Sequence, residues 1–151
     1  MAPFRRLAEL TRQECLELLG SVSYGRVVFT SHALPAIRPV NHLLLGEKII
    51  IRTTVGAAVA SAVDGSGTVV AYEADLIDAE QRLGWSVVVI GRANRVLSAA
   101  QIARYREVLI PWTDADTDEV ITIAADVVTG YRMISATAGE PGTSFPEVPA
   151  I

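Results

Sequence analysis

Most hydrophobic residues after Tyr24 fall in short runs bounded by turn residues, which is the pattern of β-strands. Short links at residues 31–36 and Gly46-Glu47 join the first three runs, so these predict an antiparallel meander. Pro39 cannot donate to a strand ladder, so its strand should be an edge or carry a bulge there. Gly91 indicates a bend in a later, longer strand. Seven such runs occupy residues 25–30, 37–45, 48–52, 68–74, 85–96, 120–124 and 127–134, and we expect about six strands to form the sheet.

Helical spacing occurs in shorter stretches before and between these strands. Thr11 and Glu14 have the T-x-x-E spacing of a capping box, and the apolar stripe that follows predicts a helix that ends near Gly20. Ser98 and Gln101 give a second capping box, which opens another helix that Pro111 ends. The remaining segments are assigned to a short helix, a polar loop and an acidic connector, at residues 55–63, 75–83 and 114–119.

Length and composition set further limits. With 151 residues, 50% of them hydrophobic, the chain can form one domain around one core. We expect residues 1–134 to form a mainly β barrel with short helices, and residues 135–151 to form a tail that is mobile or packed on a partner. The net charge of −4 argues against nucleic-acid binding. Because neither a membrane span nor a secretory signal is visible, we expect a cytoplasmic protein that contacts no membrane.

Metal and nucleophile chemistry have little support. His32 and His42 are the two histidines, and neither a cysteine pair nor an H-E-x-x-H pattern accompanies them. The acidic run 114–119 begins like a calcium loop but lacks the glycine and the final glutamate. Cys15 lies on the apolar stripe of the first helix, where a small core residue is expected rather than a nucleophile. The sequence therefore predicts no metal site and identifies no catalytic residue.

One junction has the residue types of an anion site. Arg52, Thr53 and Thr54 stand where a predicted strand passes into a helix N-terminus, whose amides and dipole favour negative charge. The threonine hydroxyls add donors, Gly56 permits close approach, and Arg52 adds positive charge. A capped helix with a surface arginine is the competing interpretation, and the sequence leaves both open.

Five segments agree, in order and spacing, with the strand plan of a known family. They are Tyr24–Val27, Ile37–His42, Ile50–Gly56, Gly84–Ala93 and Val127–Arg132. They resemble the pyridoxamine 5′-phosphate oxidase-like superfamily of flavin-binding split barrels, nearest the branch with the nitroimidazole-resistance proteins, and the resemblance covers about residues 10–134. The resemblance implies an antiparallel split barrel that works as a homodimer, with two cofactor sites lined by both subunits.

The resemblance also implies which residues line the cofactor. In relatives, the strand matching residues 38–41 runs along the isoalloxazine ring, the segment matching 52–54 holds the ribityl phosphate, and the segment matching 85–86 lies near the cofactor, often from the other subunit. The implied set is Arg38, Pro39, Val40, Asn41, Arg52, Thr53, Thr54, Gly56, Ala57, Trp85 and Ser86. Structural alternatives stay open for Trp85 as a barrel core residue, for Asn41 as a polar edge group, and for His42 as a structural histidine rather than a proton donor.

The phosphate segment departs from the family pattern. Relatives carry a hydroxyl residue and then Lys or Arg after the glycine, where this chain has Ala57 and Ala58. Losing a charged partner costs about 1.5–3 kcal/mol. The phosphate would then depend on Arg52, Arg26 or an arginine of the partner subunit, or the cofactor would be a deazaflavin rather than FMN. An oxidoreductase acting on a small-molecule substrate or electron acceptor is expected; a non-enzymatic carrier of flavin, deazaflavin or haem and a dimer with an empty site are the alternatives.

Hydrophobicity independently favours the dimer. Mean hydropathy is +0.35, and the runs at residues 49–51 and 87–90 are apolar without alternation, so both faces of the sheet need cover. The predicted helices are too few to supply it, and a second copy of the chain would.

Overall fold

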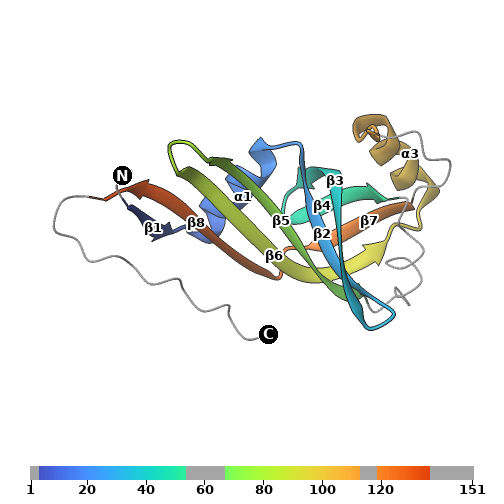
Figure 1. Ribbon diagram of the computed structural model, residues 1–151. Coiled ribbons are helices and arrows are strands. Elements are labelled where there is room, and N and C mark those ends of the chain that lie inside the picture. Colours follow the sequence, from blue (N-terminus) through green and yellow to red (C-terminus); the bar gives the residue numbers. More distant parts are fainter. Residues whose placement is uncertain (1–3, 54–66, 113–118, 137–151) are drawn as a thin grey trace.

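An eight-stranded antiparallel sheet closes into a barrel in the computed structural model, which describes residues 4–53, 67–112 and 119–136 (Figure 1). The strands are β1 (Arg5–Glu9), β2 (Tyr24–Ser31), β3 (Leu34–Leu45), β4 (Lys48–Thr53), β5 (Thr68–Asp78), β6 (Leu83–Arg95), β7 (Glu119–Ala124) and β8 (Val127–Ser135), with helices α1 (Arg12–Ser21) and α3 (Ala99–Val108). The sheet order is β1-β8-β6-β5-β2-β3-β4-β7, and β7 also pairs with β6. That pairing closes a ring of six strands, so the predicted mainly β split barrel is confirmed.

Three local predictions need correction. β1 was not predicted, because residues 5–9 have no alternating pattern and become a strand only by pairing with β8. β5 continues through Asp78, so the first part of the predicted 75–83 loop is strand. The link between β2 and β3 is only His32-Ala33, whose φ angles of 51° and 61° give a two-residue hairpin turn without glycine. The predicted helix at 55–63 and most of the acidic connector lie outside the described residues.

Pro39 lies on an edge, as predicted. β3 pairs with β2 over residues 34–41 and with β4 only from His42 onward, so residues 34–41 have one strand neighbour among the described residues. Gly91 marks the point where β6 changes partners from β8 to β7. A Cβ atom at this position would lie 1.6 Å from the carbonyl oxygen of Ala124, so only glycine allows the crossing.

The barrel interior is filled from alternate positions of each strand. On β6 the inward side chains of Trp85, Val87 and Val89 are at most 5% exposed. α1 packs on β8 and adds the fully buried Cys15 and Leu19 to the same core. The capping box is confirmed at the start of this helix, and Cys15 is the core residue that the sequence predicted.

α3 covers the outer face of the barrel at the end opposite β1 and β8 (Figure 1). Ser98 caps the helix by accepting from the Gln101 backbone amide, which is one half of the capping box that Ser98 and Gln101 predict. A separate apolar cluster, centred on Ile50 of β4 and Leu109 at the helix end, holds α3 on β4 and β7. The helix therefore ends over the β3–β4 part of the barrel, which is where the sequence analysis placed the cofactor.

Candidate functional site

The candidate site is the β3 edge, defined as residues 37–41 of β3. A 3.0 Å hydrogen bond from the His42 amide to the Ser23 carbonyl sets the phase of the β2–β3 ladder. By the alternation of antiparallel pairing, Ile37 and Pro39 turn their backbone groups away from β2. The carbonyl of Ile37 accepts from Arg38 Nη1 at 2.8 Å, and Pro39 has no N–H to offer. The β3 edge therefore presents an Ile37 donor and a Pro39 acceptor, the pair of groups that the polar edge of a planar heterocycle can bind.

Arg52, the expected phosphate ligand, contacts the C-terminal end of α3. Its Nη1 donates to the carbonyl oxygen of Leu109 at 2.8 Å and lies 3.4 Å from that of Arg106. Carbonyls of a last helical turn lack intrahelical partners and favour a nearby cation. This contact supports the structural interpretation of Arg52, while Thr53 beside it is only 3% exposed. Thr54, Gly56 and Ala57 lie outside the described residues.

The segment that follows α3 is held against the β3 edge. Asn41 Nδ2 donates to the carbonyl oxygen of Ile110 at 2.9 Å. Two residues further, the Trp112 ring packs on Tyr24 of β2, with centroids 5.3 Å apart. Tyr24 is also the direct cross-strand partner of Asn41. The structure thus brings Asn41 and Arg52 together around residues 109–112. Sequence reasoning assigned no role to Trp112; its position just after the helix-ending Pro111 was the available signal.

Trp85 and Ser86 are not brought to the β3 edge within one chain. They lie on β6, and β5 and β2 stand between β6 and β3. Trp85 is 5% exposed and packs in the barrel core, which is the structural alternative left open for it. Ser86 points to the outer face of the sheet and is half-buried. A site that used these two residues together with the β3 edge would need a second copy of the chain.

His42 has a structural environment. Its Nε2 lies 2.8 Å from the Leu19 carbonyl oxygen, which can only accept, so Nε2 carries the proton and Nδ1 accepts from the Tyr72 hydroxyl. Burial lowers the pKa of His42 and raises the pKa of Tyr72. Both groups are therefore neutral near pH 7, and His42 is held as a buried acceptor and donor rather than as a proton source.

Arg26 forms a charged cluster with two carboxylates on the outer face of the sheet. Its Nη1 lies 3.3 Å from Glu73 Oε2 and 3.5 Å from Asp75 Oδ2. Burial, together with the hydrogen bond and negative charge of Asp75, raises the pKa of Glu73 to about 7. Arg26, an alternative phosphate partner in the sequence analysis, is thus engaged by two carboxylates. Among the described residues, no three His, Cys, Asp or Glu side chains gather as a metal site would require.

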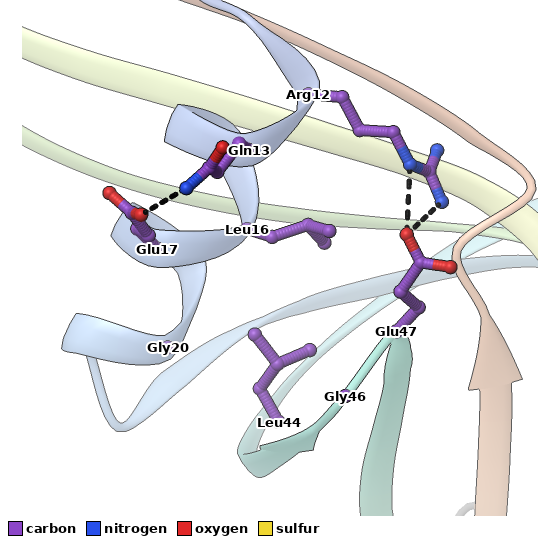
Figure 2. A pocket seen from close by; sticks show the side chains of 8 residues that line it. All are labelled: Arg12, Gln13, Leu16, Glu17, Gly20, Leu44, Gly46 and Glu47. Carbon is purple, nitrogen blue, oxygen red and sulfur yellow. Dashed lines mark hydrogen bonds and ion pairs between the residues drawn. The ribbon is translucent and has the colours of Figure 1, made fainter.

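A hollow of about 680 Å³ lies between α1 and the β3–β4 hairpin (Figure 2). Figure 2 shows Leu16 of α1 and Leu44 of β3 on its two sides. Its rim includes the Arg12–Glu47 ion pair, at 3.1 Å. None of the described residues that the sequence assigned to the cofactor lines this hollow, so it is separate from the β3 edge. Within the described segments, no helix has the length and apolar character to cross a bilayer.

The barrel is similar in sequence and in structure to known proteins. The sequence profile of a family described as pyridoxamine 5′-phosphate oxidase matches residues 11–138. An uncharacterised protein of Mycobacterium tuberculosis is 50% identical over 134 residues, which are 87% of this chain and 88% of that protein. A Corynebacterium glutamicum structure provisionally assigned as a pyridoxamine 5′-phosphate oxidase has a TM-score of 0.69 at 32% identity, and an FAD-binding protein of Mycobacterium smegmatis has 0.65 at 30%. Both alignments cover 83% of this chain and 97% of the other.

Proposed function

Because this chain belongs to the pyridoxamine 5′-phosphate oxidase family, we propose that it is a flavin-dependent oxidoreductase whose cofactor ring lies along the β3 edge. The observation that carries the proposal is the edge itself, where Ile37 and Pro39 turn a backbone donor and acceptor away from β2. The FAD-binding relative of Mycobacterium smegmatis supports the same cofactor class. A bound flavin would supply hydride or electron transfer, and the chain would bind and orient the ring.

The described residues fit the ring end of the cofactor better than its phosphate end. The β3 edge offers backbone groups in the required pattern, whereas Arg52 is engaged by the Leu109 carbonyl and Arg26 by Glu73. Ala57 and Ala58 add no charge. In this proposal the ring contributes most of the binding free energy, so FMN, FAD and a deazaflavin coenzyme remain candidate cofactors.

A homodimer completes the proposed site. The second copy would bring Ser86 and its neighbours on β6 to the β3 edge, which one chain does not do. The outer face of β2, β3, β5 and β6 supports this assembly because it carries an apolar groove of about 180 Å³. Val69 on this face is 54% exposed, and Ile37 on the same face is 56% exposed. Such a face favours association with a second apolar surface.

The proposal is tested first by the visible absorption spectrum of the purified protein and by titration with FMN, FAD, riboflavin and a deazaflavin. Ile37→Pro removes the donor at the β3 edge, and Ile37→Ala removes only the side chain and serves as its matched control. We expect the proline variant to weaken flavin binding by about threefold to tenfold, the effect of one lost hydrogen bond, and the alanine variant to do less. Equal binding by the two variants would contradict placement of the ring along this edge.

A non-enzymatic flavin carrier is the second candidate function. The engagement of Arg52 and Arg26 by other groups favours it, since a weakly held cofactor suits a carrier. Turnover of a reduced nicotinamide, or of a reduced deazaflavin, with an artificial electron acceptor separates the two functions. Stoichiometric flavin binding without turnover would select the carrier.

A further inference from the structure

Tyr24 and Trp112 form an aromatic pair beside the β3 edge. Their ring centroids lie 5.3 Å apart and their planes meet at 57°. Tyr24 is 47% exposed and Trp112 is 62% exposed, in a chain of which aromatic residues make up only 6%. A large aromatic ring left in water forgoes a substantial gain from burial, so an exposed pair marks a surface that another group can cover.

The pair is held in place by residues assigned to the cofactor. Asn41, which the sequence analysis placed along the flavin ring, pairs with Tyr24 across the strands and donates to the carbonyl of Ile110. Arg52 donates to the carbonyl of Leu109. The backbone that leads to Trp112 is therefore tied to the candidate site by two side chains. A ring surface that is ordered before binding loses less entropy when a ligand arrives.

We propose that Tyr24 and Trp112 form a stacking platform for a planar heteroaromatic ring of the bound nucleotide cofactor. This inference rests on the proposed function, because it places the platform beside the ring-binding edge. Aromatic side chains stack on nitrogen heterocycles through their π faces, as they do on the bases of single-stranded nucleic acids. Isoalloxazine and adenine share this chemistry, and the ligands chosen for the test separate them.

The chain contains two tryptophans, which makes the platform directly observable. In Trp85→Phe, Trp112 is the sole tryptophan emitter, and its fluorescence is followed during titration with FMN, FAD and ADP. Flavin binding is measured independently by flavin fluorescence anisotropy, and ADP binding by calorimetry. We expect Trp112 emission to fall by more than half at saturation with the ligand whose ring stacks there. A response to ADP identifies adenine, whereas a response to FMN identifies isoalloxazine only if Trp112→Ala also weakens FMN binding, because a flavin bound nearby quenches tryptophan by energy transfer without stacking.

Variants then test its energetic role. Trp112→Ala should weaken binding of the responding ligand by about tenfold, and Trp112→Phe should retain affinity within about threefold of the wild type. Leu97→Ala, at a residue that is 81% exposed, controls for general loss of apolar surface. Should Trp85→Phe fail to fold, the difference in emission between the wild type and Trp112→Phe gives the same signal.

The outcomes distinguish the platform from the proposed function. If the wild type binds flavin but Trp112→Ala binds every ligand within twofold of it, the platform is overturned and the proposed function stands. The same holds if Trp112 emission responds to protein concentration and not to ligand, since a second copy then covers the pair. If the wild type binds none of the ligands, both proposals fail.

Discussion

The imidazole of His42 and the hydroxyl of Tyr72 form a hydrogen-bonded pair inside the barrel, with Nδ1 2.5 Å from Oη. Their rings meet edge to face, with centroids 5.2 Å apart and planes at 88°. Because His42 Nε2 also donates to Leu19 of α1, the pair connects β3, β5 and α1. The histidine therefore contributes to the joining of helix and barrel.

Tyr72→Phe should destabilise the fold. The substitution keeps the ring but leaves Nδ1 of His42 without its donor in a buried position, which costs about 1–3 kcal/mol. Urea unfolding followed by circular dichroism measures this loss. Tyr105→Phe, at a half-buried ring of α3, is the matched control. A Tyr72→Phe protein with unchanged unfolding free energy would show that the pair contributes nothing.

The same pair predicts a dependence of stability on pH. Burial lowers the pKa of His42 in the folded protein below its ordinary value of 6.5. As pH falls below about 6.5, the unfolded chain takes up a proton that the folded chain does not, so the free energy of unfolding decreases. Above that pH, both states are neutral and the contribution is constant. His42→Gln should remove this decrease, and an unaltered pH profile in that variant would contradict the assignment.

Arg52→Gln separates helix capping from phosphate binding. Loss of the guanidinium contact with Leu109 should destabilise the protein by about 1–2 kcal/mol, a range for charged groups at helix ends. The ratio of FMN affinity to riboflavin affinity should change less than threefold, because riboflavin differs from FMN in lacking the phosphate. Arg104→Gln on the exposed side of α3 is the control. A tenfold or larger fall in that ratio would instead identify Arg52 as a phosphate ligand.

Glu73 predicts a pH effect of the opposite sign. Its pKa is raised to about 7, so between pH 4.5 and 7 the folded chain holds a proton that the unfolded chain has lost. The contribution of Glu73 to the free energy of unfolding is therefore greatest at low pH and decreases as the pH rises from 4.5 toward 7. Glu73→Gln should therefore raise the melting temperature at pH 8 by about 2–4 °C, the shift for about 1 kcal/mol after allowance for solvent screening. At pH 4.5 the variant and the wild type should melt together, and an equal gain at both pH values would refute titration as the cause.

Ala71→Arg tests the proposed homodimer. Ala71 lines the apolar groove on the outer face of β5, where a long charged side chain would oppose contact with a second sheet. Light scattering at micromolar concentration should show a dimer for the wild type and a monomer for this variant. Leu97→Arg, at an exposed residue away from that groove, should remain dimeric. A monomeric wild type would remove the basis for a site shared between subunits.

Local patterns were sufficient for much of the fold. Capping chemistry placed α1 and α3, because Thr11 and Ser98 satisfy amides within their own first turns. Apolar runs placed the six strands of the barrel, and Pro39 identified an edge, since a missing donor is a property of one residue. These signals depend on neighbours in the sequence, so the sequence alone was sufficient to predict these features.

Contacts between distant segments settled the rest. β1 exists because Arg5–Glu9 pairs with β8, more than 120 residues later, and no local pattern could indicate that pairing. The charge on Arg52 indicated an anion site, but in the folded chain its guanidinium donates to the carbonyl oxygen of Leu109 at the end of α3. Tyr24 and Trp112 are neighbours because α3 packs over β4 and β7 and so places the segment after it beside β2. Residue type reveals what a side chain can bind, whereas chain folding decides which partner reaches it.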